Sequence, residues 1–163
     1  MINAAVGVSF GIISLLAAIG IGYELSKSYD LDAISGAGLS VMAFITTQLS
    51  DGFVIDPAGF DSTGLFTAII AGIVTTEIYH FCIKKNWVFK LPDGVPPAVS
   101  NSFVSLIPAM LILVLFWTIR VPLHFNITEF IQSIFSPLLH ALNSLPGILL
   151  YTFLVSLLWC AGI

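Results

Sequence analysis

The chain alternates between long apolar runs and short polar connections. Each run is close to the roughly 20 residues that an α-helix needs to cross a 30 Å hydrocarbon core. The runs are continuous rather than alternating, which favours helices over the strands of a barrel. We therefore predict an all-α, polytopic transmembrane protein with about five spans. The predicted spans are Ala5–Tyr23, Ile34–Leu49, Leu65–Ile83, Phe103–Ile119 and Gly147–Ile163.

A different pattern lies between the fourth and fifth runs. In residues 127–142, apolar side chains recur every three or four positions, and polar side chains occupy the opposite face. Such a helix lies in the membrane interface rather than crossing the bilayer. Asn126, with Glu129 three residues later, predicts its N-terminal cap, and Pro137 predicts a kink or a break. The pattern fits a surface-lying connector or a hinge arm between two domains, and it favours the connector.

Composition supports the membrane assignment. Hydrophobic residues make up 58% of the 163 residues and charged residues 9%, whereas about 25% of a typical soluble domain is charged. The net charge of −4 provides no basic surface for nucleic acid. The two cysteines, Cys82 and Cys160, form neither a disulfide framework nor a zinc-ligand spacing, and we expect no cofactor.

The charged residues orient the predicted spans. Lys84, Lys85 and Lys90 lie between the third and fourth runs, and the positive-inside rule assigns that connection to the cytoplasm. Lys27 follows the first run and falls on the same side. The connection 50–64 contains acidic but no basic residues, which suits the outer side and leaves the N-terminus outside. Tryptophans near the predicted span ends suit interfacial anchoring: Trp87, Trp117 and Trp159.

Few side chains in the spans carry chemistry. Glu77 and His80 are three residues apart and share one helix face, so they form a candidate intramembrane polar pair. They could relay protons in a channel or a proton-coupled carrier. The simpler interpretation, which we favour, puts both at headgroup depth, paired with Lys84. Two such residues are too few for a metal site, and no catalytic motif is present, so we predict neither metal nor catalytic residues.

Small residues recur in the first two runs and predict close helix packing. They are Gly7, Gly11, Gly20 and Gly22 in the first run, and Ser35, Gly36, Gly38 and Ser40 in the second. These faces, together with the lack of a polar centre, leave open a non-transporting membrane scaffold or dimerisation module.

The stretch 91–103, LPDGVPPAVSNSF, is polar and rich in proline, although it lies between two apolar runs. Adjacent prolines fix an extended backbone, so the stretch predicts a rigid cytoplasmic loop that packs against another surface. We expect Ser100 or Ser102 to cap the fourth span and Pro108 to bend it. The residues that we expect to provide loop or dimer packing are Pro92, Gly94, Pro96, Pro97, Ser100 and Asn101.

This stretch, extended to LPDGVPPAVSNSFVSLIPA, and the terminal LLWCAGI closely resemble the sugar-transporting membrane subunit (enzyme IIC) of the bacterial phosphotransferase system. The match is to the lactose/cellobiose/diacetylchitobiose branch and covers essentially the whole chain. The resemblance implies a multi-pass protein of the bacterial cell membrane that translocates a disaccharide. It also implies a phosphorylated cytoplasmic IIB partner, which phosphorylates the sugar, and a homodimer with about ten spans per subunit.

The resemblance also divides the chain. Residues 1–119 would belong to an N-terminal dimerisation half, 120–145 to an amphipathic linker and 146–163 to the start of a substrate-binding half. The five spans would correspond to the second through sixth of the family. There, the terminal motif continues into a sugar-contacting His, and a later Glu holds the phosphorylated hydroxyl. This chain has neither, so we expect a fragment cut at both ends, not catalytic alone, with Trp159, Cys160 and Gly162 near the site.

Overall fold

The computed structural model describes residues 10–49, 54–55, 57–89, 96–123, 126–142 and 144–160. Within these residues every named element is helical, so the all-α prediction is confirmed. The chain separates into two compact units, Met1–Thr128 and Glu129–Ile163. The division of the chain at residues 119 and 145 that the resemblance implies stays a prediction.

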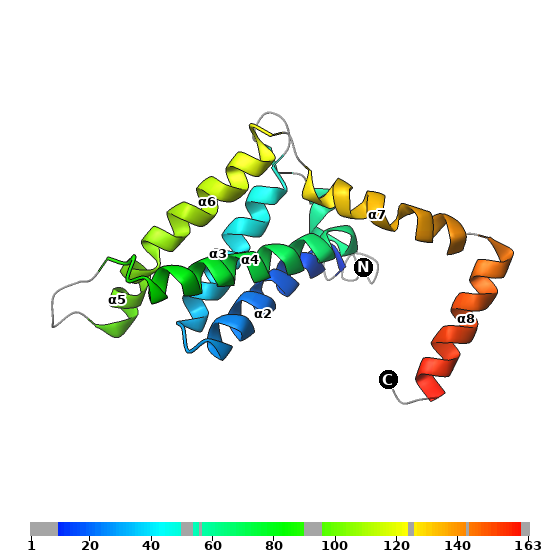
Figure 1. The fold of residues 1–163 in the computed structure, drawn as a ribbon, viewed down its shortest axis with the longest axis horizontal. Helices are drawn as coiled ribbons and strands as arrows, with labels where there is room; N and C mark the ends of the chain where they lie inside the picture. The colour runs from blue at the N-terminus through cyan, green and yellow to red at the C-terminus, as the bar shows by residue number, and fades with distance from the viewer. Residues whose placement is uncertain are drawn as a thin grey trace, which may run out of the picture. The chain divides into compact units, whose positions relative to one another are not determined.

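The first unit contains most of the helices (Figure 1). They are α2 (Ile13–Ser28), α3 (Ala33–Thr47), α4 (Leu65–Lys84), α5 (Pro97–Val104) and α6 (Leu106–Arg120), with short 3₁₀ turns η1 (Pro57–Phe60) and η2 (Ser62–Gly64). Helix α7 (Ile127–Leu142) begins at the end of this unit and continues into the second, which also contains α8 (Leu145–Cys160).

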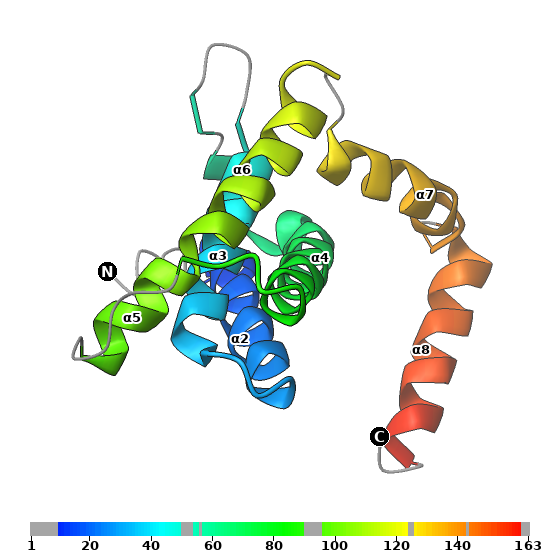
Figure 2. The same ribbon diagram turned by 60° about the vertical axis from the view of Figure 1, so that its left-hand side comes forward.

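Helices α2, α3 and α4 pack against one another, and α6 packs against α3 and α4 (Figures 1 and 2). Helices α2 and α4 run in the same direction and α3 runs against both, so Lys27 and Lys84, in the last turns of α2 and α4, lie at one end of the bundle. The core combines buried alanines with a few large side chains, chiefly Phe44, Tyr79 and Ile112.

The contact between α2 and α3 is reciprocal. Gly22 of α2 faces Ser40 of α3, and Gly36 of α3 faces Ser26 of α2. A Cβ atom added to Gly22 would lie 2.8 Å from the carbonyl oxygen of Gly36, and one added to Gly36 would lie 2.9 Å from that of Gly22. Both helices therefore use a glycine followed by a serine four residues later to bring their backbones together. The predicted small-residue packing is present at Gly22, Gly36 and Ser40, whereas Ser26 was not among the predicted residues. An added Cβ would meet no atom at Gly20 or Gly38, and Gly7 lies outside the described residues.

The predicted runs match the helices closely. The third run and α4 both begin at Leu65, and the second and fifth runs differ from α3 and α8 by at most three residues at either end. The first run differs more, because α2 begins at Ile13 and continues to Ser28, and residues 5–9 of the run lie outside the described residues. By length and apolar composition, two helical segments among the described residues could cross a membrane, Ser62–Lys84 and Val99–Arg120. Helices α3 and α8 are apolar but shorter.

The stretch after the double proline is a helix and not a loop. Pro97 occupies the first position of α5, where its fixed φ angle suits a helix and its missing N–H is not needed. Ser100 and Ser102 therefore lie inside α5, and the expectation that one of them caps the fourth span is wrong. Helix α6 begins after Ser105, which makes no side-chain capping bond.

The sequence predicts that Pro108 and Pro137 disturb their helices, and the structure shows an interruption near Pro108 only. The chain leaves the α-helix at Ser105, between α5 and α6. Pro108 lacks the N–H that would bond to Val104, the last residue of α5, so the interruption fits the bend that the sequence predicts. Helix α7 instead runs without interruption through Pro137, and the predicted break is not found. Its predicted cap is present, because the Asn126 Oδ1 accepts a 3.1 Å bond from the Thr128 amide.

Candidate functional site

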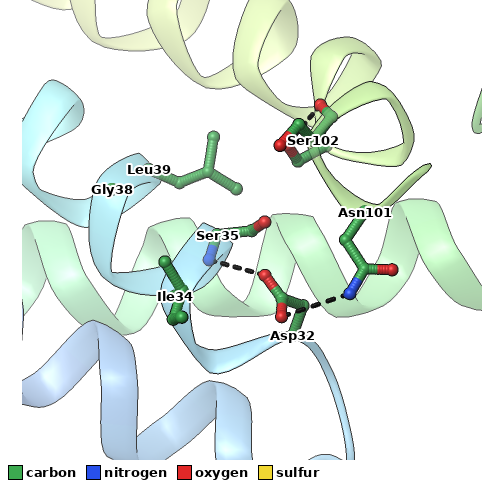
Figure 3. A pocket seen from close by; sticks show the side chains of 8 residues that line it. Asp32, Ile34, Ser35, Gly38, Leu39, Asn101 and Ser102 are labelled. Carbon is green, nitrogen blue, oxygen red and sulfur yellow. Dashed lines mark hydrogen bonds between the residues drawn. The ribbon is translucent and has the colours of Figure 1, made fainter. Parts of the chain in front are cut away.

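The turn between α2 and α3 places a carboxylate at the start of α3. Asp32 is the N-cap of α3, and its Oδ2 accepts a 2.8 Å hydrogen bond from the Ser35 amide. Its Oδ1 accepts a 3.3 Å bond from the Asn101 Nδ2 of α5, 69 residues later in the chain (Figure 3). These bonds, led by those to Ser35, hold the pKa of Asp32 below its usual value of 3.8. Asp32 is therefore a carboxylate at neutral pH.

Beside this pair lies a cavity of about 440 Å³ between α3 and the α5–α6 segment. Its polar wall consists of Asp32, Ser35, Asn101, Ser102 and Ser105, and its apolar wall consists of Ile34, Gly38 and Leu39. Figure 3 shows Asp32, Ser35 and Asn101 converging on one side of it. Among these lining residues, Asp32 is the only ionisable one. The cavity therefore combines a negative charge with hydroxyl and carboxamide groups.

Tyr29, three residues before Asp32, binds both members of the predicted polar pair. Its hydroxyl donates a 2.5 Å hydrogen bond to the Glu77 Oε1, and its ring stacks on His80 with centroids 4.5 Å apart. The Glu77 carboxylate, by this bond and by its charge, raises the pKa of the Tyr29 hydroxyl. Glu77 and His80 thus share a helix face, as the spacing predicted. In the structure both contact Tyr29 rather than the Lys84 that we expected.

Polar side chains also gather at the opposite end of α3. Thr46, Thr47 and Gln48 are buried there, and the Gln48 Nε2 donates to the Thr47 Oγ1 at 3.1 Å. The Arg120 guanidinium, at the end of α6, donates from Nε to the Leu49 carbonyl. The side chains of this cluster hydrogen-bond to one another and to the backbone at the end of α3. The open cavity at the Asp32 end is the stronger candidate for a ligand.

The remaining predicted residues fall in three places. Pro92, Gly94 and Gly162 lie outside the described residues. Pro96 caps α5 with an extended backbone, and the Ser100 amide bonds to its carbonyl at 3.1 Å. Trp159 and Cys160 are exposed at the end of α8, whereas Cys82 is buried in α4.

Metal ligands do not cluster in the part of the chain that the structure describes. No group of three or more His, Cys, Asp or Glu side chains that could hold an ion occurs there. The polar groups of the Asp32 cavity suit recognition by hydrogen bonding rather than metal coordination.

Sequence reasoning missed Asp32 and Tyr29, the two residues that organise this end of the bundle. A signal for Asp32 existed, because an Asp directly before an apolar run is typical of a helix N-cap. No local pattern links Asp32 to Asn101 or Tyr29 to Glu77, since these contacts depend on the packing of helices far apart in the sequence.

Apolar helices of this length, with charged and aromatic residues at their ends, are consistent with a helical membrane protein. The sequence profile of the family described as "Phosphotransferase system, EIIC" matches residues 1–163. The chain belongs to this family, as the resemblance predicted.

Individual relatives agree with the family match. The putative permease IIC component YwbA of Bacillus subtilis (strain 168) is 38% identical over 97% of this chain and 40% of its own length. The cellobiose-specific EIIC component of Geobacillus stearothermophilus is 38% identical over 97% of this chain and 39% of its own length. The chain thus spans about two fifths of the length of these curated relatives.

A solved structure shares the fold. The crystal structure of the transporter ChbC, the IIC component of the N,N'-diacetylchitobiose-specific phosphotransferase system, superimposes with a TM-score of 0.76 at 33% identity. The match covers 99% of this chain and 43% of the ChbC chain.

Proposed function

We propose that this chain forms part of a sugar permease of the phosphotransferase system. The observation that carries the proposal is the family match over residues 1–163, supported by the ChbC fold at 33% identity. The relatives are named for cellobiose and for diacetylchitobiose, so a disaccharide is the proposed substrate. In the whole permease, the sugar crosses the bacterial cell membrane and is phosphorylated by a phosphorylated cytoplasmic IIB partner.

We assign residues 1–119 to the dimerisation half of the permease, 120–145 to a linker and 146–163 to the start of the sugar-binding half. In this arrangement five helical segments cross the membrane and α7 lies in its interface, on the outer side. The amphipathic pattern of α7 and its Asn126 cap support the interfacial assignment. Trp159, Cys160 and Gly162 would lie beside the sugar site, most of which belongs to the remaining part of the permease.

The test is sugar binding by two purified proteins. One is the 163-residue chain, and the other is a chimera in which it replaces the matching region of the Geobacillus cellobiose-specific EIIC component. Calorimetry with cellobiose, diacetylchitobiose and lactose should show binding by the chimera and none by the short chain. A folded chimera that binds none of the three sugars would contradict the proposal. Binding by the short chain would move the sugar site into residues 1–163.

We further propose that the segment around α5 packs against a second copy of the chain. Val99 of α5 is 44% exposed, and the preceding double proline fixes the start of the helix. In a variant with Cys82 and Cys160 replaced by Ser, Val99→Cys should form a disulfide-linked dimer on mild oxidation. The matched control is Leu123→Cys, which is 64% exposed and follows α6 at its other end. Equal cross-linking at both positions, or at neither, would contradict a dimer through α5.

A further inference from the structure

The residues that line the cavity beside Asp32 carry a net negative charge. Asp32 is the only ionisable lining residue, and its hydrogen bonds to Ser35 and Asn101 favour the carboxylate. The N-terminus of α3 contributes roughly half a positive charge, which is less than the full charge of the carboxylate. The remaining charge suits a cationic ligand. Both Asp32 oxygens retain lone pairs beyond the bonds that they already accept.

The other polar groups of the wall suit a cation that donates several hydrogen bonds. Ser35, Ser102 and Ser105 provide hydroxyl oxygens, and Asn101 provides a carboxamide oxygen. A primary ammonium has three N–H donors and needs several acceptors that do not lie in one plane. A quaternary ammonium has no N–H and cannot donate a hydrogen bond to any of them.

The opposite wall is apolar and open. Ile34 is 78% exposed, and Gly38, one turn further along α3, would have no atom within 4 Å of an added Cβ. Leu39 also lines the cavity and is 5% exposed. A ligand with an ammonium at one end could therefore place a hydrocarbon chain along the exposed face of α3. This combination is the chemistry of an aminophospholipid.

The proposed membrane orientation sets the cavity at the right depth. Asp32 follows the last turn of α2, and Lys27 and Lys84 lie at this same end of the bundle. Trp87 is 53% exposed and stacks edge-on against Phe81 at this end, which is typical of the membrane interface. A lipid headgroup at the cytoplasmic surface would meet the cavity here.

We propose that the cavity between α3 and α5 binds the ammonium headgroup of an aminophospholipid such as phosphatidylethanolamine, with Asp32 as its counter-ion. The inference rests on the proposed function, which orients α3 in the membrane. It adds a lipid site that does not involve the sugar. The cavity volume of about 440 Å³ accommodates the headgroup, and the acyl chains remain in the bilayer.

The experiment is a lipid titration of the purified 163-residue chain, read by native mass spectrometry. The probes are phosphatidylethanolamine, phosphatidylcholine and phosphatidylglycerol with identical acyl chains. Phosphatidylethanolamine should bind at least about tenfold more tightly than either of the others, because a charge-assisted hydrogen bond forms only with it. Soluble ethanolamine should compete only weakly, because it lacks the acyl chains.

Asp32→Asn is the decisive variant, since Asn also caps helices well and the fold of α3 is preserved. It should lower the affinity for phosphatidylethanolamine about tenfold and leave phosphatidylglycerol unaffected. Asp61→Asn is the matched control. Asp61 also caps a short helix, through a 2.7 Å bond from the Thr63 amide, but it precedes α4 at the other end of the bundle.

Three results would overturn the proposal. The first is equal affinity for the three lipids, or equal effects of the two Asn variants. The second is full competition by free ethanolamine, which would identify a soluble amine as the ligand. The third is displacement of the lipid by cellobiose in an Asp32-dependent way, which would identify a sugar site. The lipid titration contains no sugar, so a failure to bind lipid would not affect the chimera test of the proposed function. Failure of the chimera to bind sugar would likewise leave the lipid result unaffected.

Discussion

Helices α3 and α8 are both short, apolar and uncharged, yet they pack very differently. Helix α3 buries seven of its 15 residues within the first unit, and α8 buries none of its 16 within the second. The buried residues of α3 are mainly small or hydroxyl-bearing, whereas α8 is rich in Leu and aromatic residues. In a membrane, apolarity alone gives helices no reason to associate, because lipid is equally apolar. Small side chains and interhelical hydrogen bonds therefore mark the packed faces.

The largest expected effect comes from the closest approach of two backbones. Gly36→Ala places a Cβ 2.9 Å from the Gly22 carbonyl oxygen and against Ser26, so α2 and α3 must separate. We expect the free energy of unfolding to fall by about 3 kcal/mol. Gly38→Ala is the matched control on the same helix, and it should gain up to about 1 kcal/mol because its Cβ meets open space. Thermal unfolding in detergent measures both, and equal effects would contradict the α2–α3 contact.

A smaller loss of stability is expected when α3 and α8 are compared directly by one leucine substitution in each. Leu39→Ala removes a side chain that is 5% exposed and leaves a cavity in the first unit. We expect a loss of about 2 kcal/mol in the free energy of unfolding, since the lost packing contacts are not replaced. Leu149→Ala, in α8, removes a side chain that is 69% exposed and should change stability by less than about 0.5 kcal/mol. Comparable losses in denaturant titrations of the two variants would show that α8 is as well packed as α3.

Buried hydroxyl groups allow a finer comparison. The Thr67 and Thr128 hydroxyls, at the starts of α4 and α7, share a 2.9 Å hydrogen bond in a buried position. Thr67→Val should cost about 1–2 kcal/mol, because it leaves the Thr128 hydroxyl without this partner. The Thr75 hydroxyl is buried without a partner, so Thr75→Val should be neutral or slightly stabilising.

A double variant tests whether the hydroxyl bond is the cause. Thr67→Val with Thr128→Val should recover part of the loss, because no buried hydroxyl is then left unpaired. Strictly additive losses in the two-variant cycle would contradict the hydrogen bond.

The sequence predicts the positions of the helices better than the contacts between them. Apolar runs locate α3, α4 and α8 within a few residues, because a span needs a fixed length of apolar chain. The sequence predicts a loop where the structure has the α5 helix, since adjacent prolines suit both an extended segment and a helix start. The Asp32–Asn101 and Tyr29–Glu77 bonds could not be predicted, because each joins residues that only helix packing brings together.

The smallest expected effect concerns the cap of α3. Asp32→Ala should cost about 1 kcal/mol, and Asp32→Asn should cost less because Asn keeps the capping acceptor. The native pKa of Asp32 lies below its usual 3.8, so its contribution is present above that value and disappears as the pH falls through the native pKa. Melting temperatures of the wild-type chain and of Asp32→Asn should therefore converge in acid. A difference in melting temperature that stays constant down to the most acid pH would mean that the carboxylate charge does not stabilise the α3–α5 contact. Packing would then hold the polar end of α3, as it holds the buried middle of this helix.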